Sequence, residues 1–162
     1  MDHTGELERG EAEGLPNRIA GRSLNVTIDG HDLYMHMTDF SDGRLGNLVL
    51  DLSDKSPPAL RETIRMLGET ISIGLKFGAP IEKFIEAYEG HRSSPSGEVK
   101  GDDEIVYCTS ILDYIAKRLS RDYADKQLVA PAPKPGRPQS RFAVIDGGLE
   151  RKGATPPPQP GA

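Results

Sequence analysis

The stretch that decides the fold is LNVTIDGHDLYMHM, residues 24–37. Apolar and polar side chains alternate on both sides of Asp29-Gly30, a dipeptide that is typical of a tight β-hairpin turn. A second turn signal, Asp42-Gly43, is followed by alternating leucines over residues 48–52. The pattern predicts a three-stranded antiparallel meander with one apolar face.

The hydrophobic period changes to that of a helix after this meander. Ser56 is the expected N-cap and Pro57 the expected first helical residue. One apolar stripe at helical spacing then runs from Leu60 to Leu75, and Gly78 is a typical C-terminal stop. The sequence therefore predicts a long first helix directly after the last strand of the meander.

Two further helices are expected downstream. A short one runs from about Pro80 to Tyr88, and residues 91–101 are polar and typical of a loop. Residues 102–103 offer two aspartates that could cap a third helix, with Cys108 on its buried stripe. Together with the meander, about three helices predict an α+β domain whose small sheet is covered on one face.

Composition divides the chain into three parts. Residues 1–14 hold five acidic residues and one arginine and are expected to be disordered. The α+β domain is expected over residues 15–126. Residues 127–162 hold eight of the thirteen prolines, so we expect a disordered Pro/Gly-rich tail there.

Charge and hydropathy exclude several classes of partner. Residues 15–126 hold fourteen basic and eighteen acidic side chains, so the domain lacks the basic field of a nucleic-acid-binding protein. No apolar run approaches the roughly 18 residues of a membrane span. The first residues lack the basic and apolar regions of a secretory signal. We therefore expect a cytoplasmic protein that binds neither nucleic acid nor membrane.

Four stretches resemble the C-terminal part of cobalamin-dependent (class II) ribonucleotide reductases: residues 15–18, 42–51, 71–87 and 109–115. The resemblance covers about two-thirds of the chain, but only the end of the much longer enzyme. Its strand and helix order is also similar to the TSCPD domain found beside such enzymes. The resemblance implies a ribonucleoside-diphosphate reductase system, and thus deoxyribonucleotide synthesis for DNA replication.

The thiols that the reductase family uses are not matched in this chain. The resemblance implies radical chemistry in a large barrel with active-site cysteines and a cobalamin pocket, and a C-terminal cysteine pair that re-reduces them. This sequence has one cysteine, Cys108, and the stretch 54–59 before the first helix holds none. We therefore expect no catalytic residue, no bound cofactor and no metal site, and an accessory or regulatory role beside a reductase catalytic chain.

Two alternative functions stay open from the sequence. The chain could supply the C-terminal piece of a split cobalamin-dependent reductase in trans, or it could be a recruited protein- or nucleotide-binding module. The sequence has no glycine-rich phosphate loop that would favour nucleotide binding. It also does not indicate an oligomeric state.

Seven side chains are candidate partner contacts, each with a simpler interpretation. Two lie on the predicted polar sheet face, two at the second hairpin tip and three in an apolar island of the tail. The simpler interpretations are a solvated face, ordinary turn chemistry and isolated apolar residues in a tail. The seven are Tyr34, His36, Asp42, Arg44, Phe142, Val144 and Ile145.

Other conspicuous residues have structural interpretations. Cys108 is expected to be a buried structural thiol rather than a redox sensor. His31, His36 and His91 do not show the spacing of a zinc site. The basic residues around positions 117–121 could contact an acidic partner, but complementing the helix dipole at the end of the third helix is the favoured interpretation.

Overall fold

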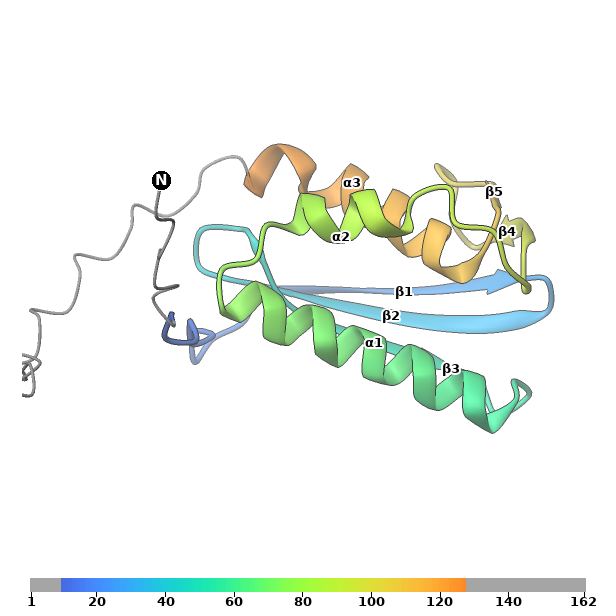
Figure 1. Cartoon of the computed structure of the whole chain (residues 1–162), viewed down its shortest axis with the longest axis horizontal. Coiled ribbons are helices and arrows are strands. Elements are labelled where there is room, and N and C mark those ends of the chain that lie inside the picture. The colour runs from blue at the N-terminus through green and yellow to red at the C-terminus, as the bar shows by residue number, and fades with distance from the viewer. Residues whose placement is uncertain (1–9, 128–162) are drawn as a thin grey trace, which may run out of the picture. The chain divides into compact units, whose positions relative to one another are not determined.

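The computed structural model describes residues 10–127. These residues form three helices and a five-stranded antiparallel sheet, whose strands lie in the order β3-β2-β1-β4-β5 (Figure 1). The predicted α+β class is confirmed. The elements in chain order are β1 (Gly21–Ile28), β2 (His31–Asp39), β3 (Leu45–Leu52), α1 (Pro58–Lys76), α2 (Ile81–Tyr88), β4 (Gly97–Lys100), β5 (Tyr107–Cys108) and α3 (Ile111–Gln127).

The predicted meander of β1, β2 and β3 is confirmed. β1 and β2 pair over the whole length of β1. The turn between them holds Asp29 at φ 47° and Gly30 at φ 77°, as a two-residue type I′ hairpin requires. Because side chains alternate along a strand, Val26, Met35 and Leu50 point to one face of the sheet, and all three are buried.

β4 and β5 correct the sequence prediction, which placed a loop over residues 91–101 and three strands in the sheet. β4 buries one side chain, Val99, and β5 is two residues long. Neither shows the alternation that identifies a strand from sequence. Within the described residues, β4 pairs with β1 only at Thr27 and Ile28.

The first helix begins slightly later than predicted. α1 starts at Pro58, and its N-cap residue is Pro57 rather than Ser56. The Ser56 hydroxyl is instead hydrogen-bonded to Nδ1 of His31 at 2.8 Å. It therefore ties the β3–α1 connection to the start of β2.

α1 lies against the outer edge of β3. The backbone N–H of Leu48 donates to Oγ of Ser72 at 2.8 Å, and this oxygen lies 3.1 Å from the Leu48 carbonyl. A Cβ at Gly68 would lie 2.9 Å from the same carbonyl oxygen. Because any side chain at Gly68 would push the helix away, glycine permits the contact. The helix thus covers the edge that β3 would otherwise expose.

The third helix corrects two predictions. α3 begins at Ile111, well after the cap predicted at residues 102–103. Oγ of Ser110 accepts the N–H of Asp113 at 3.0 Å and caps the first turn. Cys108 consequently lies in β5 rather than on the helix, and it is buried there.

The three helices cover one face of the sheet. α1 packs along β3, and α2 packs against α3 (Figure 1). Ile71 of α1 and Ile115 of α3 are buried in the same core as the inward-facing strand residues. Among residues 10–127, no helix is long and apolar enough to cross a bilayer.

Candidate functional site

The uncovered face of the sheet carries Tyr34 and His36. Both alternate with the buried residues of β2, so they point away from the helices. Tyr34 is 38% exposed, and its ring is parallel to that of His36 with the centroids 6.5 Å apart. Ser23 of β1 is hydrogen-bonded to Nδ1 of His36 at 2.7 Å, and Val49 of β3 is exposed on its other side. We call these four residues the open face.

The His36 ring of the open face is held by its neighbours. A serine–histidine pair becomes nucleophilic when a third group orients the imidazole and donors stabilise an oxyanion. The described contacts of the His36 ring are the bond to Ser23 and the stacking on Tyr34. Gly21 leaves room for that ring, because a Cβ there would lie 3.2 Å from it. Packing therefore holds the histidine in place as part of a surface.

The β2–β3 hairpin tip holds Asp42 and Arg44. The Arg44 side chain is 7% exposed and bonds the carboxylates of Asp42 at 2.7 Å and Glu13 at 3.0 Å. Burial disfavours its charge, but these carboxylates outweigh burial and raise the pKa of Arg44. Its guanidinium also lies 4.9 Å from the centroid of the Phe40 ring. Arg44 thus holds Glu13 against the domain, whereas Asp42 stays half exposed.

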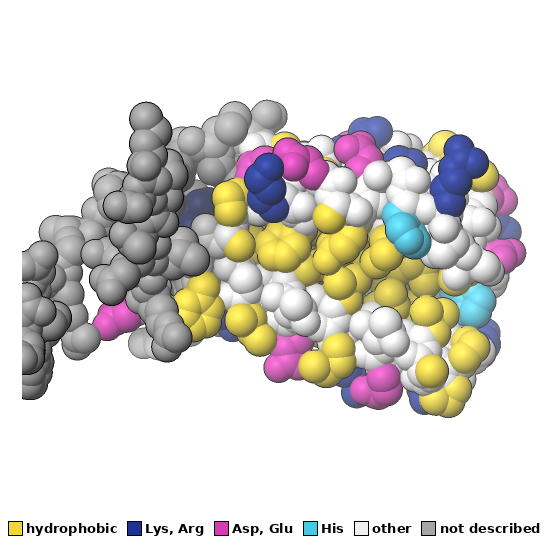
Figure 2. Space-filling model, in the orientation of Figure 1, with side chains coloured by type: hydrophobic (Ala, Val, Ile, Leu, Met, Phe, Trp, Pro, Cys, Tyr) yellow, Lys and Arg dark blue, Asp and Glu magenta, His cyan; other side chains and the backbone are white. Residues whose placement is uncertain are grey.

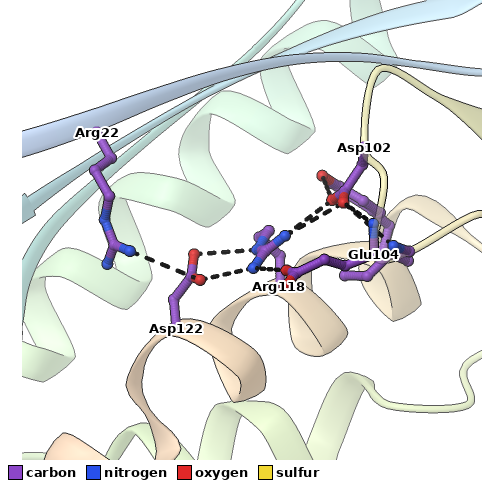
Figure 3. Close-up of polar contacts among 7 residues, drawn as sticks. Arg22, Asp102, Glu104, Arg118 and Asp122 are labelled. Atoms are coloured by element: carbon purple, nitrogen blue, oxygen red, sulfur yellow. Dashed lines mark hydrogen bonds and ion pairs between the residues drawn. The ribbon is translucent and has the colours of Figure 1, made fainter.

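A group of charged side chains joins α3 to β1 and to the loop between β4 and β5 (Figure 3). Its centre is Arg118 of α3, which lies 3.2 Å from Asp102. The same guanidinium lies 2.6 Å from Glu104 and 2.7 Å from Asp122. Arg22 reaches Asp122 from β1 at 3.7 Å. We call these five residues the charged cluster.

Asp102 and Arg118 are the buried members of the charged cluster. Burial disfavours the charged form of Asp102. The backbone N–H of Glu104, the hydroxyl of Tyr114 at 2.8 Å, the N–H of Ile105 and the Arg118 guanidinium outweigh burial and lower the pKa of Asp102. Because these partners come from the β4–β5 loop and α3, the cluster fixes the loop on the helix.

The interpretation of the basic residues near position 117 is corrected. α3 continues to Gln127, so Lys117 and Arg118 lie in the middle of the helix and do not complement its C-terminal dipole. Lys117 bonds Asp113 at 2.7 Å, and Arg118 belongs to the charged cluster. Arg121, one turn further on, is exposed.

Sequence reasoning missed the partners of Arg118. Asp122 follows it at i,i+4, which is a recognisable signal for a helical ion pair. Asp102 and Glu104 lie in a loop, and Arg22 lies on a distant strand, so no local pattern connects them with Arg118.

Two grooves adjoin these groups. One, of about 320 Å³, lies between β3 and α1 and includes Val49, Arg65 and Lys76. The other, of about 330 Å³, lies between β1 and α3, and we call it the β1 groove. Its lining residues are Arg22, Ser23, Leu24, Met37, Arg118 and Asp122.

The Cys108 thiol and the rings of His31 and His36 lie in different environments. Cys108 is buried, as predicted, and burial raises the pKa of its thiol, which disfavours the reactive thiolate. The rings of His31 and His36 bond different serines. In the described part of the chain, no three His, Cys, Asp or Glu side chains are grouped so that they could hold a metal ion.

The sequence profile of the TSCPD domain matches residues 9–123. The chain belongs to the TSCPD domain family. The resemblance predicted from sequence is therefore confirmed. In this TSCPD domain, three of the four stretches that carry it contribute to the structural core: residues 42–51 form the hairpin tip and most of β3, residues 71–87 the end of α1 and most of α2, and residues 109–115 the start of α3.

Vitamin B12-dependent ribonucleotide reductases are relatives of this TSCPD domain. The enzyme of Bradyrhizobium diazoefficiens is 35% identical over 116 residues, which are 72% of this chain and 9% of the reductase. That of Agrobacterium fabrum is 37% identical over 120 residues, 74% of this chain and 9% of the reductase. The chain thus spans about a tenth of the length of these relatives. No solved structure matches it.

The remaining candidates lie outside the region that the family profile matches. Phe142, Val144 and Ile145 fall outside the described residues. Partner contact by these three residues therefore stays a prediction, as it does for Tyr34, His36, Asp42 and Arg44.

Proposed function

We propose that this TSCPD domain is a non-catalytic accessory or regulatory protein of ribonucleotide reduction. It binds the catalytic chain of a vitamin B12-dependent ribonucleotide reductase in the cytoplasm and so acts in deoxyribonucleotide synthesis, which supplies DNA replication. The observation that supports this proposal is the match to the C-terminal region of such reductases, which covers most of this chain and 9% of the relatives.

The sulfur content supports a non-catalytic role. Exchange between thiols and disulfides needs thiolates placed within reach of one another. The sequence has one cysteine, and its thiol is buried with a raised pKa. Cys108 therefore suits packing in the core better than thiol relay or radical transfer.

The surface of β1 and β2 supports binding. The open face presents an aromatic ring and hydrogen-bonding groups, and tyrosine is a residue type that protein interfaces favour. We expect the substitution Tyr34→Ala to weaken binding to the reductase while the fold is retained. Tyr107→Ala is the matched control, because Tyr107 is also exposed but lies on β5.

The test uses the full chain and a vitamin B12-dependent reductase from the same organism from which the C-terminal TSCPD region has been deleted. We expect the two proteins to elute together in size-exclusion chromatography, and the rate of ribonucleotide reduction to change on addition of the chain. Separate elution with an unchanged rate would refute the proposal. Deoxyribonucleotide formation by the chain alone, with cobalamin and a thiol reductant, would refute the non-catalytic part.

The same assay separates an accessory protein from a piece of a split enzyme. An accessory protein changes the rate of a reductase that keeps its own TSCPD region. A split piece restores the truncated enzyme and leaves the complete one unchanged.

A further inference from the structure

The first half of β1 has a neighbouring strand on one side. β1 pairs with β2 along its whole length, but its register with β4 covers Thr27 and Ile28. In the described part of the chain, no strand pairs with Gly21–Val26 on the β4 side. β1 is therefore central at its C-terminal end and an edge strand at its N-terminal end.

The backbone groups that face this open edge follow from the hydrogen-bond pattern. The N–H of Val99 donates to the carbonyl of Val106, so Val99 faces β5, and Lys100 faces its partner Thr27 on β1. In an antiparallel ladder, alternate residues direct their N–H and C=O to the same side. Ser23 and Asn25 therefore face the same side as Thr27.

Of the backbone N–H and C=O groups of Ser23 and Asn25, one is covered and the others face an unoccupied edge. Gly101 lies against the carbonyl of Asn25, because a Cβ there would be 2.7 Å from its oxygen. The exposed residue Ser23 keeps its N–H and C=O toward the open edge, and Asn25 keeps its N–H. A row of unpaired strand groups is a template for an added strand.

The opposite edge of the meander differs. There α1 contacts β3 directly through Gly68, and Ser72 bonds both backbone groups of Leu48. Along β1, in contrast, long side chains separate the strand from α3: Arg22 spans to Asp122 at 3.7 Å, and the β1 groove of about 330 Å³ lies beside this pair. The β3 edge is closed by a helix, whereas the β1 edge has room beside it.

The β1 groove fits the side chains of an added strand. A new strand would lie about 4.8 Å from β1, with alternate side chains on the helix side of the sheet. On that side Leu24 is half-buried and Met37 is buried, which suits an apolar side chain. The Arg22 side chain on the same side is 44% exposed. It suits an acidic side chain of the added strand, two residues away from the apolar one.

We propose that an extended segment of the reductase catalytic chain, with an apolar and an acidic residue at alternate positions, pairs with β1 at Ser23 and Asn25. This inference rests on the proposed function. In the reductases the matching region is C-terminal, so the rest of the polypeptide precedes it. Here the matched residues begin at position 9, and the segment that follows them leads to Ala20, whose carbonyl accepts the N–H of Asp39 beside the start of β1. In chain order, β1 is therefore the first strand after the point where a reductase would connect.

The test compares Ser23→Pro with Ser23→Ala in the full chain. Proline removes the outward N–H and leaves the β1–β2 ladder intact, because that N–H faces away from β2. Alanine removes the same hydroxyl, and with it the bond to His36, but keeps the N–H. We expect Ser23→Pro to bind the truncated reductase at least about tenfold more weakly than Ser23→Ala, which measures the loss of the hydroxyl alone.

The outcomes separate this inference from the proposed function. If the wild-type chain binds the reductase and Ser23→Pro binds equally well, the β1 edge is not the docking site, although the accessory role stands. If the wild-type chain does not bind, both fail. A second measurement does not depend on a variant: amide hydrogen exchange of Ser23 and Asn25 in the wild-type chain, alone and in the complex.

We expect both amides to exchange rapidly in the isolated chain and slowly in the complex. Rapid exchange in the complex would overturn the proposal. Protection in the isolated chain would also overturn it, because the edge would already be occupied by residues of the same molecule. Protection that grows with the concentration of the chain alone would assign the edge to a second copy instead.

Discussion

The hydroxyl of Tyr123 donates a 2.6 Å hydrogen bond to Oδ1 of Asp39, which joins α3 to the end of β2. The Tyr123 side chain is buried, and the Arg22 guanidinium of β1 lies 5.1 Å from its ring centroid. Three elements that are distant in sequence therefore meet at one aromatic ring. Tyr123→Phe would keep the ring and remove the hydrogen bond.

We expect Tyr123→Phe to lower the free energy of unfolding by about 1–2 kcal/mol, because the Asp39 carboxylate loses a buried donor. Urea denaturation followed by circular dichroism measures the change. Tyr107→Phe is the control, since Tyr107 is exposed on β5. Equal stabilities of the two variants would contradict a structural role for the hydroxyl.

Gly68→Ala tests the contact between α1 and β3. The new Cβ would lie 2.9 Å from the Leu48 carbonyl oxygen, which is backbone and cannot rotate away. We expect a loss of about 1–3 kcal/mol in unfolding free energy, although alanine is the better helix former. Glu69→Ala, on the exposed side of the same helical turn, should change stability little. A stabilised Gly68→Ala variant would show that the helix does not press on the strand.

Arg118→Met tests the charged cluster. The substitution leaves Asp102 buried without its cation, so we expect a loss of about 3–5 kcal/mol. The matched control is Arg121→Met, on the same helix but exposed. Thermal and urea unfolding of both variants measure the difference. If Arg118→Met costs no more than Arg121→Met, the cluster contributes nothing to folding.

We expect low pH to lower the folding stability of the domain, because Asp113 becomes protonated. Burial disfavours its charge, but the Lys117 ammonium and the N–H groups of Thr109 and Gly90 outweigh burial and lower its pKa. A lowered pKa in the folded state stabilises the fold above the unfolded pKa of about 4, and this stability is lost as the pH falls below that value. Asp113→Asn should therefore show a lower stability at pH 7 and a flatter decline between about pH 4 and pH 2. Asp103→Asn is an exposed control, and an unchanged slope in Asp113→Asn would contradict the prediction.

The Cys108 thiol should react slowly. The side chain is buried and its pKa is raised by burial, so both access and thiolate content are low. We expect an aromatic disulfide reagent at pH 8 to label the native chain far more slowly than the chain unfolded in urea. Similar rates in the two states would contradict the buried position of the thiol.

The parts of the fold that depend on local patterns could be predicted from the sequence. The alternation around Asp29-Gly30 identified two strands and their turn, and the stripe from Leu60 to Leu75 identified α1. β4 was missed because Val99 is its single buried side chain, which gives no alternation of apolar and polar residues. Its pairing with β1 makes it a strand, and local periodicity does not show that pairing. The start of α3 was misplaced because Asp102 resembles a cap but binds Arg118 and Tyr114.

The candidate site was predictable to a similar extent. The alternation of β2 placed Tyr34 and His36 on one exposed face, as the structure shows. It could not show that Arg44 is buried, because its partner Glu13 lies 31 residues away in sequence. The sequence could not predict that the first half of β1 lacks a neighbour on the β4 side either. The length of the β1–β4 pairing depends on where a polar loop turns, and no local pattern shows this.

The closure of the β3 edge by Ser72 has a consequence for stoichiometry. Filamentous assembly through strand pairing needs two complementary edges on each molecule, so that every added subunit offers a place for the next. Here one side of the meander is occupied by the molecule's own helix, and the usable part of the other side is confined to the first few residues of β1. The meander can therefore accept a strand on one side only, which favours a one-to-one complex over an open-ended polymer built through its two sides.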